Sequence, residues 1–136
     1  MKVSTEFYTL TPYAGLLHVE SFLSWDEKVS EQFMKDAMGL VLQYYTENDW
    51  AVLHDMRNWQ LGTPEFERIL SGLLHREVTH THTHHALVVG TSRIKTWQVE
   101  KIFKDIARYK IRLFRHYKDA EKWLASQGFD KSVPLF

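Results

Sequence analysis

The sequence predicts an α/β fold with a mostly parallel sheet, and three observations support this prediction. Short segments with the apolar pattern of strands alternate with longer segments of helical spacing, in the order β-β-α-β-α-β-α-β-α. Residues 85–90 form the most continuously apolar run, which is typical of a strand covered on both faces. Pro12 and Gly15 stand in a short turn between the first two strands, so the N-terminal strand should join the sheet in an antiparallel hairpin. With 136 residues, the chain suits one domain over residues 1–136.

The first three elements come from the N-terminal part of the chain. Residues 3–10 alternate in the manner of a strand, residues 11–15 supply the turn, and residues 16–23 form the second strand. Ser24 and Glu27 match a capping box, in which the two side chains satisfy free backbone N–H groups at the start of a helix. The apolar residues that recur at helical spacing in this first helix are Phe33, Ala37, Leu40, Val41 and Tyr44.

The middle of the chain predicts a strand, a loop and a second helix. Residues 50–56 are a short apolar strand, and residues 57–62 read as a loop. Thr63 then serves as the N-cap of a helix, with Pro64 at the first helical position, where no backbone N–H is needed. The apolar stripe of this helix comprises Phe66, Ile69, Leu70, Leu73 and Leu74.

The last elements follow the apolar strand. Ser92 can cap a helix over residues 93–108, and residues 110–115 alternate as a further strand. Asp119 can cap a final helix, which Gly128 ends as a typical C-terminal glycine. The apolar residues of the helix over residues 93–108 include Ile94, Trp97, Ile102 and Ile106.

Composition excludes several classes of protein. The formal net charge is zero, so no overall basic surface for nucleic acid or anionic membrane is expected. The absence of cysteine excludes disulfides, thiolate nucleophiles and zinc–thiolate sites. No apolar run approaches the length of a membrane span, and the first ten residues lack the apolar stretch of a secretory signal. We therefore expect a cytoplasmic protein without a cofactor.

Three stretches resemble a known family: AVLHDMRNW (51–59), HHALVVGTSR (84–93) and IRLFRHYKDAEKWLASQG (111–128). The last is the most specific, because in the family a short strand leads into a helix with an A..WL pattern, here Ala120, Trp123 and Leu124. Over essentially its whole length the chain resembles the STAS domain, and within it the SpoIIAA-like or STAS/SEC14-like group. The resemblance implies the fold of the bacterial anti-sigma factor antagonists and a non-catalytic, regulatory module that binds another protein.

The sequence departs from the family at one functional segment. The antagonists carry an Asp-Ser-Ser-Gly-type segment at the start of a helix, and a partner kinase phosphorylates its serine. The matching region here is residues 61–65, where Thr63 offers the only hydroxyl and Pro64 follows it. Thr63 is thus a phosphorylation candidate by resemblance, although its role as a helix N-cap already explains it.

A ligand or partner site is expected where the parallel strands end, because ligands of open α/β sheets gather at the carboxyl ends of the strands. Trp59 and Trp97 would form the apolar walls of this crevice. Free N–H groups at a helix N-terminus favour an anion, so a small apolar or anionic ligand is the alternative that the SEC14-like comparison implies. Plain helix capping with a solvated arginine is the competing interpretation. The residues expected at this edge are Asp55, Arg57, Asn58, Trp59, Thr91, Ser92, Arg93, Arg115 and His116.

No pattern points to an enzyme. A nucleophile elbow, a phosphate-binding loop and paired carboxylates are all missing from the sequence. His54 and Asp55 are neighbours within a strand and should point to opposite faces, which weakens them as an acid–base pair.

The stretch THTHTHH, residues 79–85, leaves three interpretations open. In an extended chain His80, His82 and His84 would share one side and could converge on a metal ion, with His85 on the other side. The stretch precedes the strand over residues 85–90, at its amino end, where a solvated helix-to-strand loop is the simplest interpretation. A pH-sensitive surface is the third.

The first helix also carries apolar residues on a second face. A stripe this wide suggests that the helix is covered on more than one side, by the sheet and by a partner or another copy of the chain. A protein partner or a homodimer is therefore expected, and a metal-responsive module is the remaining alternative. The residues of the second face are Met34, Met38, Val41 and Tyr45.

Overall fold

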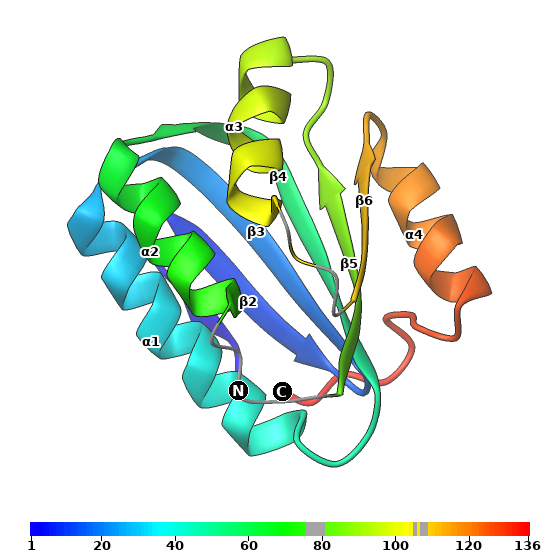
Figure 1. Cartoon of the computed structure of the whole chain (residues 1–136). Helices are drawn as coiled ribbons and strands as arrows, with labels where there is room; N and C mark the ends of the chain where they lie inside the picture. The colour runs from blue at the N-terminus through cyan, green and yellow to red at the C-terminus, as the bar shows by residue number, and fades with distance from the viewer. Residues whose placement is uncertain (76–80, 105, 107–108) are drawn as a thin grey trace.

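A computed structural model describes residues 1–75, 81–104, 106 and 109–136, with the backbone alone for residues 73–75. Six strands of this described part form one sheet in the order of the sequence (Figure 1). The first three strands are antiparallel neighbours, and the third to the sixth run parallel. The strands are β1 (Val3–Ser4), β2 (Tyr8–Tyr13), β3 (Leu16–Trp25), β4 (Trp50–Gly62), β5 (His82–Val88) and β6 (Lys110–Phe114). The predicted α/β fold is thus confirmed, with one more N-terminal strand than expected.

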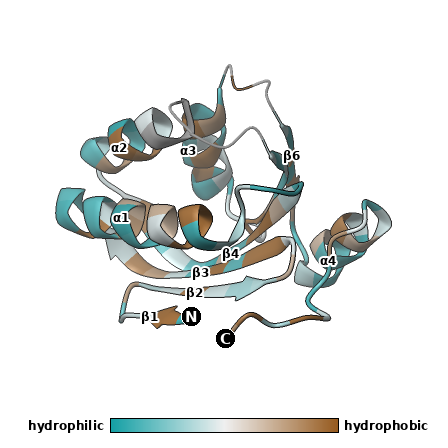
Figure 2. Ribbon diagram, turned by 90° about the horizontal axis from the view of Figure 1, so that it is seen from below, coloured by the Kyte–Doolittle hydropathy of each residue, from teal (hydrophilic) through white to brown (hydrophobic). Residues whose placement is uncertain are grey.

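The helices cover the two faces of the sheet unequally. Three of them lie on one face and the fourth packs on the other, against β4, β5 and β6 (Figures 1 and 2). No helix in the described part of the chain is long and apolar enough to cross a membrane. The helices are α1 (Glu27–Tyr44), α2 (Pro64–His75), α3 (Arg93–Phe103) and α4 (Tyr117–Ser126).

Two apolar clusters, one on each face, hold the layers together. The larger lies between the sheet and α1, α2 and α3, and it contains Trp25, Trp50 and Trp59, all nearly fully buried. The smaller lies under α4 and includes Ala120 and Leu124. Burial of each large apolar side chain contributes about 2–3 kcal/mol, so the three-helix face supplies most of the hydrophobic stabilisation.

The N-terminal hairpin differs from its prediction in where the chain turns. The Thr5 hydroxyl accepts hydrogen bonds from the backbone N–H groups of Phe7 and Tyr8, which breaks the predicted strand in two. The strand β2 then continues through Pro12, although residues 11–15 were predicted to form the turn. The carbonyl of Pro12 accepts from the backbone of Leu135, so the missing N–H of proline faces the outer side of the strand, where it is tolerated.

Two of the predicted helix caps are wrong, and two are right. The strand β3 runs to Trp25, so Asp26 caps α1 and accepts from Val29 N at 3.0 Å, whereas Ser24 bonds to a side chain of β4. His116 stands at the N-cap of α4, and Asp119 lies inside its first turn. The N-caps Thr63 and Ser92 are confirmed, since their hydroxyls accept from Phe66 N and Lys95 N at 3.3 Å each, and Gly128 follows α4 at φ +95°.

The segment predicted as a loop over residues 57–62 is the second half of β4. It stays paired with β3, where Asn58 lies opposite Phe22 and Gly62 opposite Trp25. The register shifts after Asp55, because β4 uses one residue more than β3 between paired positions, as in a β-bulge. This extra residue reverses the alternation, so that Met56 and Trp59 both face α1, α2 and α3.

The helix predicted over residues 93–108 ends at Phe103. The rest of that prediction lies partly outside the described residues. In α1, Val41 and Tyr45 of the predicted second face are buried within the chain itself, and Met34 and Met38 are half-buried. This covering removes part of the reason for expecting a homodimer, which stays a prediction.

Candidate functional site

A surface groove of about 430 Å³ lies between α3 and the carboxyl ends of β5 and β6. It brings together Thr91, Arg93, Trp97 and Arg115, as the sequence predicted for this edge. Ser92, between two of these residues, is engaged as the N-cap of α3. A groove therefore lies at the predicted edge, lined by α3 and the ends of β5 and β6 without the residues expected from β4. Its role as a binding site stays a prediction.

Contacts with β4 hold α3 in place beside the groove. Lys95 Nζ donates to the carbonyl oxygens of Met56 and Arg57 at 3.0 and 3.1 Å, next to the bulge of β4. Gln98 is buried and bonds through both side-chain atoms to the backbone of Gly62, at 3.1 Å to the N–H and 2.8 Å to the carbonyl. The acceptors and donors on β4 lie in or next to the segment that was predicted to be a loop. These hydrogen bonds fix the orientation of α3.

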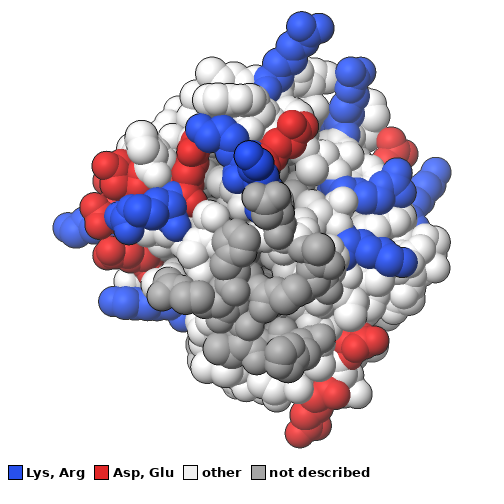
Figure 3. Space-filling view, in the orientation of Figure 1, with Lys and Arg blue, Asp and Glu red and all other residues white. Residues whose placement is uncertain are grey.

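The groove is cationic and partly apolar. Trp97, which lines the groove, is 59% exposed. Ile94 is on the same helix but is not one of the lining residues, and it is 57% exposed. Arg93 and Arg115 are exposed, and neither forms an ion pair among the described residues. Figure 3 shows Lys and Arg side chains gathered in the upper and right parts of the view, the region of α3, β6 and α4 in Figure 1. Glu100 lines the groove as well.

Asp55 and Arg57, predicted at the same edge, form a separate site on the α4 face of the sheet. Arg57 Nε and Nη2 donate to the two carboxylate oxygens of Asp55 at 2.9 and 2.8 Å, and the Arg57 backbone N–H donates at 3.1 Å. The guanidinium also lies over the ring of Tyr117 in α4. Burial raises the pKa of Asp55, but the hydrogen bonds and charge of Arg57 outweigh burial and hold that pKa below its usual value.

The same face carries further polar groups that contact one another. The hydroxyl of Tyr117 lies 3.2 Å from His18 Nε2 and accepts from Lys131 Nζ at 2.7 Å. Lys131 also pairs with Glu121 at 3.1 Å. Burial and the charge of Lys131 lower the pKa of His18 to about 4, so His18 is neutral at pH 7. These groups satisfy one another, and the network has the character of a structural tie between α4 and the sheet.

Trp59 does not line the groove, although it was predicted to form one of its walls. The extra residue in β4 turns its side chain into the core, where it is 1% exposed and packs on Phe66. Thr63 lies beside a shallow depression lined by four carboxylates, those of Asp26, Glu27, Glu31 and Glu65. Lys28 lines the depression too, but the carboxylates outnumber it, so a phosphate on Thr63 would meet a net negative surrounding that disfavours phosphorylation. The phosphorylation of Thr63 stays a prediction.

A β-bulge also changes the histidine run. Trp50 pairs with His82, and the next residue of β4 pairs with His84, so one residue of β5 is skipped. As a result His82 and His85 face the three-helix side together, while His84 packs against Trp123 on the α4 side. The prediction that His82 and His84 share one side is therefore wrong, and His80 lies outside the described residues. Among the described residues no group of three His, Asp or Glu side chains could hold a metal ion.

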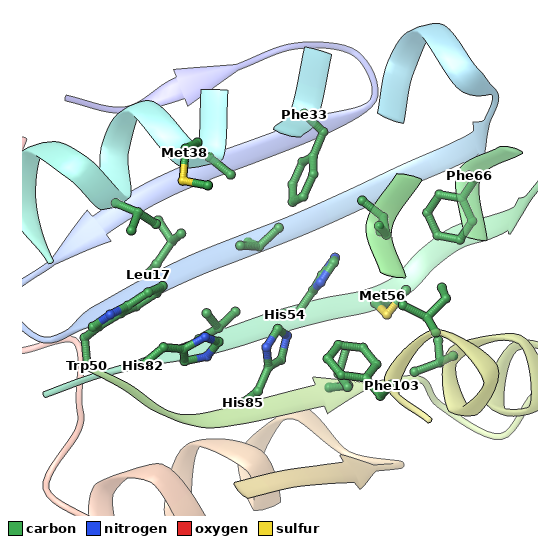
Figure 4. A pocket seen from close by; sticks show the side chains of 18 residues that line it. Leu17, Phe33, Met38, Trp50, His54, Met56, Phe66, His82, His85 and Phe103 are labelled. Atoms are coloured by element: carbon green, nitrogen blue, oxygen red, sulfur yellow. The ribbon is translucent and has the colours of Figure 1, made fainter. Parts of the chain in front are cut away.

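His82 and His85 line a buried cavity of about 100 Å³ between the sheet and α1, α2 and α3. Figure 4 shows His54 and His85 directed from β4 and β5 toward the side of Phe33, with His82 beside Trp50. Apart from the ring nitrogens of these histidines and of Trp50, the lining is hydrocarbon or thioether. Among its remaining lining residues are Leu17, Val19, Met38, Val52, Met56, Phe66, Leu87, Val99 and Phe103.

The three histidines differ in their hydrogen bonding. The ring of His82 stacks between Trp50 and Tyr109, at centroid distances of 4.4 and 4.0 Å, and its Nε2 lies 3.1 Å from the carbonyl of His84. His54 Nε2 lies 2.5 Å from the hydroxyl of Ser21.

His85 is 6% exposed, and neither of its ring nitrogens has a hydrogen-bond partner among the described residues. Burial lowers the pKa of His54 to about 3 and that of His85 well below its usual value, so both rings are neutral at pH 7.

Sequence reasoning missed this cavity. The three interpretations of the histidine run were a solvated loop, a metal site and a pH-sensitive surface, and His54 was considered only as an acid–base partner of Asp55. The expectation that His54 and Asp55 point to opposite faces is confirmed, since His54 lines the cavity and Asp55 contacts Arg57 on the other side. A signal was available in the apolar neighbours of His54 in the strand over residues 50–56, which predict a buried imidazole.

Comparison with known proteins bears on the fold. The chain matches no family model and no curated protein sequence. Several solved structures are similar to it. One is an uncharacterised protein of the DUF3478 family from Shewanella loihica PV-4 with a SpoIIAA-like fold, at a TM-score of 0.66 and 11% identity, covering 91% of this chain and 98% of the other.

Another similar structure is the anti-sigma factor antagonist SpoIIAA in its unphosphorylated form. Its TM-score is 0.58 at 10% identity, and the alignment covers 87% of this chain and 97% of SpoIIAA. The chain has a SpoIIAA-like fold. The architecture that the resemblance implied is thus confirmed at the level of the fold. At these identities the comparison extends no further.

Proposed function

We propose that this protein is a non-catalytic, cytoplasmic SpoIIAA-like module that regulates by binding a protein partner at the groove beside α3. The observation that carries the proposal is the pairing of an exposed indole, Trp97, with two arginines that lack an ion-pair partner among the described residues, Arg93 and Arg115. The similarity to SpoIIAA, an anti-sigma factor antagonist, adds support at the level of the fold.

The composition of the groove favours a protein over a small ligand. Trp and Arg are the residue types most enriched among the energetically dominant positions of protein interfaces. The groove is open, and the indole of Trp97 lies on its rim, under Lys101 Nζ at 4.1 Å from the ring centroid. A small molecule would be poorly enclosed here, whereas a peptide segment could cover the indole and exclude water from it.

The charges define the chemistry of the partner. Arg93 and Arg115 favour a segment that presents carboxylates, and Trp97 favours an apolar side chain of that segment. We therefore propose an acidic, partly apolar segment of another protein as the occupant. Complementary charge would mainly raise the rate of association, and burial of Trp97 would supply most of the affinity.

Affinity capture with matched variants tests this proposal. Biotinylated protein is used as bait in a lysate of the source organism, in three forms: wild type, a groove variant with Arg93→Glu, Trp97→Ala and Arg115→Glu, and a control with Lys28→Glu and Lys35→Glu. The control reverses two exposed cations on α1, so the total charge changes equally. Captured proteins are quantified by mass spectrometry.

The proposal expects a partner that the wild type and the control retain and the groove variant loses. Titration of the purified partner should then show at least tenfold weaker binding to Trp97→Ala alone, as for the loss of an interface hot spot. A partner that binds the groove variant as tightly as the wild type would contradict the proposed surface.

A further inference from the structure

We propose that the cavity between the sheet and α1, α2 and α3 binds a small, uncharged, ring-sized molecule that carries one hydroxyl group, which hydrogen-bonds to His85. This site is separate from the groove, because Val99 and Ile102 reach it from the buried side of α3 while Trp97 lies on the exposed side. The inference therefore rests on other observations than the proposed function does.

The size and lining of the cavity define the bulk of the ligand. Its volume is about 100 Å³, the same order as a hydrocarbon-lined cavity of about 150 Å³ that binds benzene. Phe33, Phe66 and Phe103 present aromatic surfaces to the space, and aromatic rings pack well edge-to-face against such surfaces. A single ring therefore fits, and a lipid chain or a fused polycyclic molecule would not.

His85 defines the polar group of the ligand. Its imidazole is buried, and it contacts Phe103 and the rings of His82 and Tyr109, while no described residue forms a hydrogen bond to either of its ring nitrogens. A neutral imidazole has one N–H donor and one acceptor nitrogen, and leaving them unpaired in the interior is unfavourable. A hydroxyl can both donate and accept, so it can pair with either nitrogen that faces the cavity, whatever the tautomer.

Other occupants fit less well. A buried water usually makes about three hydrogen bonds, and a space walled mainly by carbon offers too few partners. An anion or a cation would lack a counter-charge, because no Lys, Arg, Asp or Glu lines the cavity in the described part of the chain. Met38 and Phe103 are the half-buried members of the lining, so flexible side chains stand between the cavity and solvent.

Isothermal titration with phenol and toluene tests the site, because the two molecules differ by a hydroxyl in place of a methyl group. The wild type should bind phenol at least as tightly as toluene. In His85→Phe, which removes both nitrogens but keeps a ring, toluene should bind within twofold of the wild-type affinity and phenol about tenfold more weakly. Ala37→Leu, which fills the cavity from α1, should abolish binding of both.

Several results would overturn the proposal. These are the failure of both molecules to bind the wild type, an unchanged phenol affinity in His85→Phe, and one equivalent of Zn²⁺ bound by the wild type but not by His85→Phe. Should His85→Phe not fold, the side-chain ¹⁵N resonances of His85 in the wild type provide a second readout. Addition of phenol should shift one of them, and unchanged resonances under saturating phenol would likewise overturn the proposal.

Discussion

On the α4 face of the sheet the buried charged and polar groups form hydrogen bonds with one another, whereas on the face covered by α1, α2 and α3 a buried imidazole has no hydrogen-bond partner among the described residues. Asp55 on the first face receives three hydrogen bonds from Arg57. His85 on the second face forms no hydrogen bond through its ring with any residue that the structure describes. The two faces are built by the same strands, and residues adjacent in sequence, such as His54 and Asp55, contribute to different faces.

This difference separates a structural site from a candidate binding site. A satisfied polar network makes the packing of α4 specific, and its residues are explained by the fold. An unsatisfied polar group costs stability, and natural proteins tolerate such costs mainly where function needs the group. By this criterion the three-helix face is the one that carries a ligand site in its interior.

The largest expected effect is a loss of stability in mild acid. His18, His54 and His85 have pKa values lowered by burial, His18 to about 4 and His54 to about 3. Above pH 6.5 these histidines are neutral in both folded and unfolded chains, and below it only the unfolded chain gains protons. The free energy of unfolding should therefore fall by about 1 kcal/mol per histidine per pH unit, roughly 3–6 kcal/mol from pH 6.5 to 4.5.

Urea denaturation followed by circular dichroism between pH 7 and 4.5 measures this loss. The pKa of Asp55 is lowered below 3.8, so Asp55 keeps its stabilising contribution throughout this range and loses it only at lower pH. The slope of the unfolding free energy against pH gives the number of protons taken up on unfolding. A value below one proton would show that the histidines are not buried as described. In His85→Phe the slope should decrease by one proton.

The next effect concerns the α4 face. Arg57→Ala leaves the carboxylate of Asp55 buried with one backbone hydrogen bond, and it should lower the free energy of unfolding by about 3 kcal/mol. It should also raise the pKa of Asp55, so the variant should lose less stability than the wild type as the pH falls through 3.8. Arg93→Ala, which removes an exposed arginine without an ion pair among the described residues, is the control and should change stability by less than about 0.5 kcal/mol.

Smaller changes in stability are expected from two Ala→Leu substitutions, one on each face of the sheet. Ala37→Leu extends into the cavity and should stabilise the protein by about 1 kcal/mol. The same substitution at Ala120, which lies on α4 and is fully buried, should overpack that face and cost about 1–3 kcal/mol. Thermal unfolding of the two variants under one set of conditions makes the comparison. Equal destabilisation of both would mean that no usable space exists near Ala37.

The order of strands and helices could be predicted from the sequence, because period-two and helical apolar patterns survive in each element. The ends of elements could not. β3 and β4 run on together to Trp25 and Gly62 because each strand gives the other its hydrogen-bond partners. Whether two strands lengthen each other in this way depends on their register. The polar residues at 57, 58 and 60 gave this segment the composition of a loop. Trp59, an apolar residue between the polar residues 58 and 60, was the sign of a strand that the sequence did offer.

Of the two candidate sites, the groove could be predicted in part from the sequence and the cavity could not. Thr91, Arg93 and Trp97 were placed correctly because the carboxyl ends of parallel strands meet at one edge. The cavity could not be predicted from the sequence pattern. A bulge opposite Trp50 brings His82 and His85 to one face, although simple alternation places them on opposite faces. The space between them also depends on how three helices pack.

The most direct test is to compare His54, which is hydrogen-bonded, with His85, which is not. It measures the urea unfolding of two matched variants, His54→Phe and His85→Phe, at pH 7.5. Both remove an imidazole from the cavity wall and replace it with a phenyl ring. His54→Phe strands the buried hydroxyl of Ser21 and should cost about 1–3 kcal/mol. His85→Phe removes two unpaired polar atoms and should leave stability unchanged or increase it. A loss in His85→Phe as large as that in His54→Phe would show that His85 serves the fold and would contradict the account.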